Sequence, residues 1–262
     1  MTDQSGFDLK PTIDWYKKNK DILLARLPTQ GHSNIFPVTR NAEPDISEAE
    51  IAGLIGLFPQ QARDRSILQD IIIMPSTWFH RDSTSDKPIP TQDVREAINT
   101  TSIAPSYIDY KDWLGKIVLF KLPRRQVRDS DIRKIIASEG LVHEVAHSIA
   151  VEPMYRNEYS MIFPGNSVVQ GEDFVKNFVD STEPLPPISH YSSLFRYKNG
   201  KFKGKCPSTI YRSISEELAE SITAYLLGFA YSGDNERSLD PFKDRPEVKR
   251  LMHDFLHARR KK

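Results

Sequence analysis

The stretch DIRKIIASEGLVHEVAHSIAVEP, residues 131–153, decides how this chain is interpreted. Its apolar residues recur at helical spacing, at positions 132, 135, 136, 142, 145 and 149. Asp129 or Ser130, just before it, can cap the first turn of a helix. Pro153 limits the other end, because proline cannot continue a helix without losing a hydrogen bond. We therefore predict one helix from about residue 130 to Pro153.

This predicted helix contains the pattern His143-Glu144-Val145-Ala146-His147. A spacing of four places the two imidazoles on one face of a helix, one turn apart, so that both can reach a single metal ion. Glu144 is angled so that its carboxylate meets a water bound to that metal, which is the position of a general base. The alternative is that these are ordinary polar residues on the exposed side of an amphipathic helix.

A catalytic zinc site needs a third protein ligand and an open position for water. Cys206 is the only cysteine, so the ligands would be histidines and carboxylates, and no internal disulfide can form. A third histidine at the metzincin spacing would fall at residue 153, which is proline. The remaining common solution is a glutamate from a second helix, and SEELAES at 215–221 offers three.

Glu216 and Glu220 share one face of a predicted helix over residues 213–231, which stops near Gly233. We expect Glu216 to bind the metal and Glu220 to accept the free N–H of His143 or His147, which fixes its tautomer. Glu217 is the reserve ligand. The alternative is that Ser213 and Glu216 form a capping box while Glu217 and Glu220 are solvated charges.

Around these helices the sequence predicts further short elements. Strands are expected within SILQDIIIMP and KIVLFKLP, residues 66–75 and 116–123, because β-branched residues are frequent there and proline closes each run. Further helices are expected at about 12–26, 47–58 with Ser47 and Glu50 as a capping box, 172–180, and from Pro246. Residues 1–45 are interpreted as a loosely packed lead-in, and six prolines between 152 and 209 indicate loops.

Composition limits the classes of protein that the chain can represent. The 262 residues include 36 Lys+Arg and 35 Asp+Glu, for a formal charge of +1, so no whole-chain field favours nucleic acid or an anionic membrane. No apolar run approaches the roughly 18 residues of a membrane helix, and the polar first twenty residues hold no secretory signal. We expect a soluble protein that is cytoplasmic, or exported without a standard signal peptide.

Together, His143-Glu144-x-x-His147 and Glu216-Glu217-Leu218-Ala219-Glu220 resemble the gluzincin zinc metallopeptidases of the anthrax lethal factor and Pro-Pro endopeptidase type. The second motif of that group has the form Glu-x-x-Ala-Glu, in which the first Glu is the ligand and the last supports the site. The group also has a Ser-x-Tyr phrase whose tyrosine steadies the oxyanion, and Ser189-His190-Tyr191 is similar to it. Tyr191 precedes Glu216 by 25 positions, so residues 192–212 would loop out, and Tyr211 is the competing candidate. Either tyrosine could instead be a half-buried ring with its hydroxyl in water.

The resemblance implies an α+β, zincin-like domain, in which a small mixed sheet lies over the 130–151 helix and a helical C-terminal part supplies the last ligand. Residues 46–262 would form this catalytic domain, with an insertion at 152–212. The expected reaction is peptide hydrolysis at Zn²⁺, with Glu144 as general base and a tyrosine at the oxyanion. An extended substrate could add along the edge of the 116–123 strand. Alternatives are an inactive binding protein with the same fold and a metal hydrolase of non-peptide substrates.

A second pair of histidines, His253 and His257, repeats the spacing of four near the C-terminus. Asp254 follows the first histidine, and no third ligand is evident in the sequence. We favour a surface position for this pair, and it remains a rival metal site.

Overall fold

The computed structural model describes residues 10–31, 37–40, 45–74, 106–109, 116–120, 127–155 and 158–261. Its contacts divide the chain into two compact units. The first unit comprises Met1–Leu54 and Leu68–Glu144, and the second comprises Ile55–Ile67 and Val145–Lys262. The division falls inside helix α5 (Ser130–Tyr155), between Glu144 and Val145.

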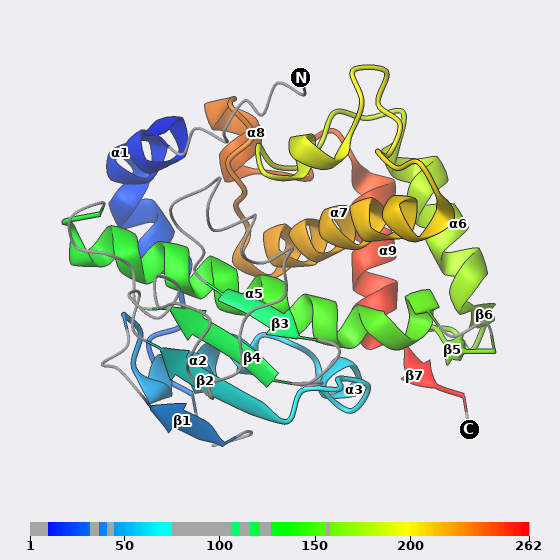
Figure 1. Cartoon of the computed structure of the whole chain (residues 1–262), viewed down its shortest axis with the longest axis horizontal. Coiled ribbons are helices and arrows are strands. Elements are labelled where there is room, and N and C mark those ends of the chain that lie inside the picture. Colours follow the sequence, from blue (N-terminus) through cyan, green and yellow to red (C-terminus); the bar gives the residue numbers. More distant parts are fainter. Residues whose placement is uncertain are drawn as a thin grey trace, which may run out of the picture. The chain divides into compact units, whose positions relative to one another are not determined.

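The first unit holds a four-stranded mixed sheet with the order β1-β2-β4-β3 (Figure 1). Its strands are β1 (Val38–Arg40), β2 (Asp70–Met74), β3 (Ser106–Asp109) and β4 (Lys116–Phe120). β1 and β4 both pair with β2 in parallel, and β3 pairs with β4 antiparallel. The isoleucines of β2 and β4 supply its buried side chains, Ile71 and Ile117 being partners in register and both 0% exposed. The predicted small mixed sheet and its two predicted strands are confirmed.

One expectation about this sheet is wrong. β4, the strand in KIVLFKLP, has β2 on one side and β3 on the other, so it cannot offer an edge to a substrate. The sequence pattern could not reveal this, because β3 lies outside the stretches that were predicted as strands. Among the described strands of this sheet, the two edges are β1 and β3.

The helices of the first unit begin with capped turns. In α2 (Glu48–Gly56) the backbone N–H of Ser47 donates to Glu50, and the N–H of Glu50 donates to the Ser47 hydroxyl, which confirms the predicted capping box. Asp129 caps α5 (Ser130–Tyr155) by accepting the backbone N–H groups of Asp131 and Ile132. Such caps satisfy backbone donors that have no partner within the helix.

Helix α1 (Lys10–Arg26) is packed more tightly than the composition of residues 1–45 suggested. Trp15, Tyr16 and Leu23 are buried, and the Tyr16 hydroxyl donates to Glu139 of α5. The apolar face of α1 therefore belongs to the core of the first unit.

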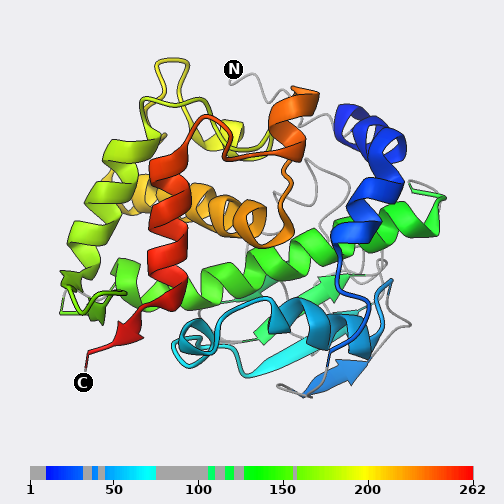
Figure 2. The ribbon, with the colours of Figure 1, turned by 180° about the vertical axis from the view of Figure 1, so that it is seen from behind.

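The second unit is mainly helical. Figures 1 and 2 show α9 (Pro246–His257) beside α6 (Gly171–Thr182) and α7 (Pro207–Leu227), and these pairs are in contact. Phe174 of α6 stacks on Phe255 of α9, with ring centroids 4.5 Å apart. The unit also contains the short elements α3 (Gln60–Arg63), η2 (Ser192–Phe195), α8 (Asn235–Leu239) and the strands β5 (Ser160–Ile162), β6 (Val168–Gln170) and β7 (Arg259–Arg260). With its separate small sheets and its helical C-terminal part, the chain is α+β.

Two helix boundaries differ from those predicted. α5 continues past Pro153 to Tyr155, because a proline in the last turn removes only one backbone hydrogen bond. α7 begins at Pro207 and ends at Leu227, because the next residue, Gly228, has a left-handed φ of 75° that stops the helix before Gly233. Ser213 therefore lies inside α7, where its hydroxyl donates to the carbonyl of Lys203, and the capping-box alternative for Ser213 and Glu216 is wrong.

The segment over 152–212 contains more regular structure than its prolines indicated. It includes β5, β6, α6, η2 and the first turns of α7. Residues 192–212 accordingly do not loop out as a whole. Among the described helices, none is long and apolar enough to span a lipid bilayer.

Candidate metal centre

The part of α5 that carries the histidines is buried along its whole circumference. Every residue from 141 to 150 is buried, and His143, Glu144 and His147 are 9%, 8% and 6% exposed. The alternative that these three residues lie on the exposed side of an amphipathic helix is therefore wrong. Burial of three polar side chains is costly unless each has a polar or metal partner.

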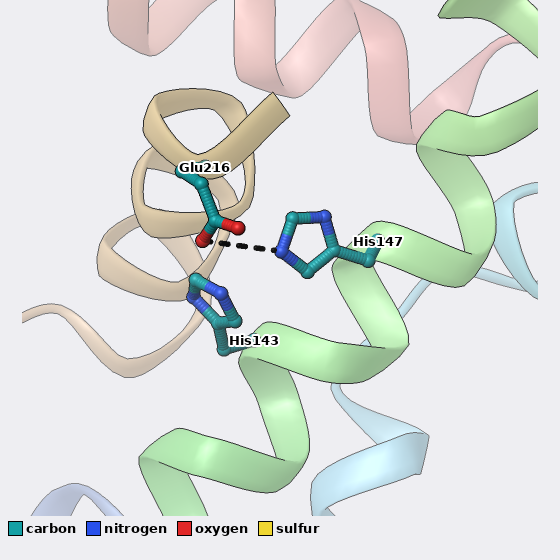
Figure 3. Close-up of side chains that lie close together, drawn as sticks. All are labelled: His143, His147 and Glu216. Carbon is teal, nitrogen blue, oxygen red and sulfur yellow. Dashed lines mark ion pairs between the residues drawn. The ribbon is translucent and has the colours of Figure 1, made fainter. Parts of the chain in front are cut away.

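A carboxylate from α7 meets the two histidines. One ligand atom from each of His143, His147 and Glu216 lies within 4.8 Å of the other two. Figure 3 shows the three side chains pointing toward one another, with Nε2 of His147 3.5 Å from Oε2 of Glu216. Helix geometry alone sets the spacing of the two histidines, whereas Glu216 lies on another helix, 69 residues after His147 in the chain.

Ser215 orients the ring of His147. Its Oγ lies 3.0 Å from Nδ1 of His147, and Ser215 is 8% exposed. If Nδ1–H donates to this hydroxyl, the lone pair of Nε2 points toward Glu216 and is available to a metal ion. Ser215 was not predicted from the sequence, although its place directly before Glu216 was the available signal.

Glu220 was expected to accept an N–H from His143 or His147. In His147, however, Nδ1 faces Ser215 and Nε2 faces Glu216, so we no longer expect His147 to donate to Glu220. Glu220 itself is partly buried on α7. That Glu220 supports His143 remains a prediction.

Glu217, the reserve ligand, faces a different part of the second unit. It is 0% exposed, and its Oε1 lies 2.8 Å from Nη2 of Arg196 and accepts the backbone N–H of Ile188. Arg196 also donates to the carbonyls of Thr182 and Gly200. Glu216 rather than Glu217 therefore joins the histidines, and Glu217 anchors α7 to the segment before it.

A second guanidinium is buried near the Glu217 carboxylate. Arg245 is 6% exposed, and burial lowers its pKa while the charge of Glu217 acts in the opposite direction. Two arginines and one carboxylate thus share this interior region.

The two candidate oxyanion residues lie in different elements. Tyr191 is partly buried just before η2, with its ring 5.3 Å from that of Phe195. Tyr211 is partly buried on α7, five residues before Glu216, which places it about 140° around the helix from that carboxylate. Helix geometry thus disfavours Tyr211, and the choice of Tyr191 remains a prediction.

The second histidine pair is in a different environment. His253 is exposed on α9, its Nδ1 lies 3.0 Å from the hydroxyl of Tyr225, and its ring centroid lies 4.2 Å from that of His257. Nδ1 of His257 lies 2.8 Å from the backbone carbonyl of His253. Among the residues that the structure describes, the one cluster of three possible metal ligands is that of His143, His147 and Glu216.

The donor set of this cluster fits zinc. Two imidazole nitrogens and one carboxylate oxygen are the ligands of many catalytic zinc sites, and zinc bonds of 2.0–2.2 Å place tetrahedral ligand atoms roughly 3.3 Å apart. The separation of 3.5 Å between His147 and Glu216 is close to that value, and the three ligand atoms together lie within 4.8 Å of one another. Comparisons of the chain with known protein families, with curated proteins and with solved structures found no match.

Proposed function

We propose that this protein is a zinc-dependent metallopeptidase of the gluzincin type, with a zincin-like fold. The observation that carries the proposal is the convergence of His143, His147 and Glu216 in a buried region, with Glu144 next to the first histidine. The donor chemistry and the position of Glu144 support a hydrolytic centre rather than a purely structural metal site, because three protein ligands meet among the described residues, and a catalytic zinc site combines three protein ligands with one open position.

In this proposal, His143, His147 and Glu216 hold the metal and Ser215 holds the tautomer of His147. When bound, zinc supplies Lewis acidity that polarises a carbonyl and acidifies water. Glu144 takes the proton from the attacking water at its carboxylate and passes it to the leaving nitrogen. Tyr191 donates a hydrogen bond to the developing oxyanion.

The proposed substrate is a peptide in extended conformation. Because β4 is flanked on both sides, the strand addition expected there is assigned to β3 instead, which is the described edge next to β4. Main-chain hydrogen bonds to such an edge tolerate many sequences, and side-chain pockets then set specificity.

The test combines metal analysis with a single substitution. The full chain is loaded with zinc, and the wild type is compared with Glu144→Gln on broad peptide libraries. We expect one tightly bound zinc in both proteins and a fall in kcat of about 10²–10⁴-fold in the variant, which is the usual contribution of a general base. Glu172→Gln, at an exposed position on α6, is the matched control and should retain full activity.

Three results would contradict the proposal. If the wild type and Glu144→Gln both bind zinc and neither cleaves any peptide, the result would favour a binding protein. If the wild type hydrolyses ester or amide metabolites but leaves the peptide libraries uncleaved, the result would favour another kind of metal hydrolase. Absence of zinc binding would remove the metal centre altogether.

A further inference from the structure

The 32 residues from 184 to 215 contain six Lys and Arg residues and no Asp or Glu. Four of the six are lysines between positions 198 and 205. The other 230 residues carry 30 basic and 35 acidic residues, a surplus of five negative charges. The near-neutral net charge of the whole chain therefore includes a strongly basic segment, and this segment ends at Ser215, which lies next to His147.

The centre of this segment is a short β-hairpin, residues 195–203, visible as the projecting yellow loop in Figure 1. Arg196 and Phe202 form an antiparallel bridge, and the backbone N–H of Tyr197 donates to the carbonyl of Lys201. Gly200 closes the turn with a φ of 84°, and a Cβ there would lie 2.6 Å from the carbonyl oxygen of Glu183. Glycine is therefore required at this turn.

The two faces of the hairpin differ in chemistry, as the alternation of a strand demands. On the inner face, the guanidinium of Arg196 lies 4.4 Å from the ring centroid of Phe202, and both residues are buried. On the outer face, Tyr197 is 49% exposed and Lys201 is exposed. The buried pair of Arg196 and Glu217 fixes the inner face to α7.

The outer lysines are available to a partner. Lys198, Lys201 and Lys205 are exposed and form no ion pair with any residue in the described part of the chain. Lys203, by contrast, donates to the carbonyl of Leu194 and helps to hold the hairpin. A rigid element that presents tyrosine and lysine side chains loses little conformational freedom on binding, which favours affinity.

We propose that the exposed side chains of Tyr197, Lys198 and Lys201 on this hairpin, together with Lys205 just after it, bind an acidic segment of the peptide substrate. The inference rests on the proposed peptidase function and names its substrate class. Exposed ammonium groups attract carboxylates and speed their encounter, and the tyrosine ring supplies apolar contact. A continuous polyanion such as nucleic acid fits less well, because the rest of the chain is acidic.

The test uses fluorescein-labelled octaglutamate and fluorescence anisotropy with the full chain. The triple variant Lys198→Glu/Lys201→Glu/Lys205→Glu is compared with Lys18→Glu, which makes the same kind of charge change at an exposed position on α1. We expect the triple variant to bind octaglutamate about five- to fifty-fold more weakly, given the modest strength of exposed ion pairs, and Lys18→Glu to match the wild type. Wild-type binding should weaken between 50 and 500 mM NaCl.

The measurement is repeated in Glu144→Gln, so it can be interpreted whether or not hydrolysis occurs. Binding of octaglutamate without any peptidase activity would uphold the surface and overturn the proposed function. Hydrolysis with equal binding of octaglutamate and octalysine, or with an unaffected triple variant, would overturn the surface alone. Stronger lysine-dependent binding of an oligothymidylate or of phosphatidylserine vesicles than of octaglutamate would likewise overturn it. In any substrate found by cleavage, the triple variant should raise KM and leave kcat unchanged.

Discussion

The two histidine pairs of this protein have the same spacing and opposite surroundings. His143 and His147 lie on a stretch of α5 that is buried on all sides, where a carboxylate and a hydroxyl from α7 meet them. His253 is exposed on α9, and its neighbours are the hydroxyl of Tyr225 and the ring of His257. The spacing of four residues makes two imidazoles neighbours, and only the residues that pack against them decide whether a metal ion can be enclosed.

The largest expected difference between the pairs is in zinc binding. His147→Ala removes a central ligand and should abolish tight binding of zinc, whereas His257→Ala should retain one zinc per chain. Isothermal titration calorimetry and metal analysis of the full chain measure both, with circular dichroism as the check on folding. Loss of the tight zinc in His257→Ala alone would reverse the assignment of the two pairs.

The surroundings of the first pair also depend on the packing of α7, which carries Glu216. Glu217, which joins α7 to Arg196, provides a test of that packing. Glu217→Ala leaves the guanidinium of Arg196 buried without its carboxylate, and we expect the free energy of unfolding to fall by about 3–5 kcal/mol. Glu172→Ala, on the exposed side of α6, should change it by less than about 0.5 kcal/mol. Urea denaturation compares the two variants, and equal midpoints would show that the buried pair does not stabilise the second unit.

Ser215 permits a finer test of what distinguishes the first pair. Ser215→Ala removes the hydroxyl next to Nδ1 of His147, and we expect zinc affinity to fall about 10- to 100-fold, the usual effect of losing such an orienting group. Ser213→Ala, two residues earlier on α7, is the control, because that hydroxyl donates to a backbone carbonyl instead. Competition with a chromophoric zinc chelator gives both affinities. Equal values for the two variants would exclude an orienting role for Ser215.

The smallest effect is expected at the exposed pair, where Tyr225 contacts His253. Burial raises the pKa of Tyr225, and the charge of Asp254 raises it further. The folded protein therefore keeps a neutral phenol at a pH where the unfolded chain ionises it. Stability conferred by this group is complete below about pH 10 and is lost as pH rises toward the folded pKa. Tyr225→Phe should lack this loss, so the difference in unfolding free energy between the two proteins, about 0.5 kcal/mol at pH 7, should shrink as pH rises above about 10.

Local patterns predicted the elements near the candidate site well. The capped start of α5, the strands β2 and β4 and the existence of α6, α7 and α9 followed from periodicity and from cap residues, which act over a few neighbouring positions. The boundaries of α7 could not be predicted in this way, because several prolines and glycines lie near its ends and no local pattern shows that Pro207 starts the helix and Gly228 stops it. The partner of β4 did not follow either, because strand pairing joins segments that no local pattern connects.

By itself, the sequence determined that His143 and His147 share a helical face with Glu144 beside them, since 3.6 residues per turn leaves no other arrangement in a helix. It also determined the basic character of residues 184–215. Only the tertiary structure decided between two adjacent glutamates, which lie about 100° apart on α7. Glu216 turns toward His147, while Glu217 turns into the interior against Arg196. Neighbouring residues of a helix face different partners, and which partners those are depends on packing between segments that are distant in the chain.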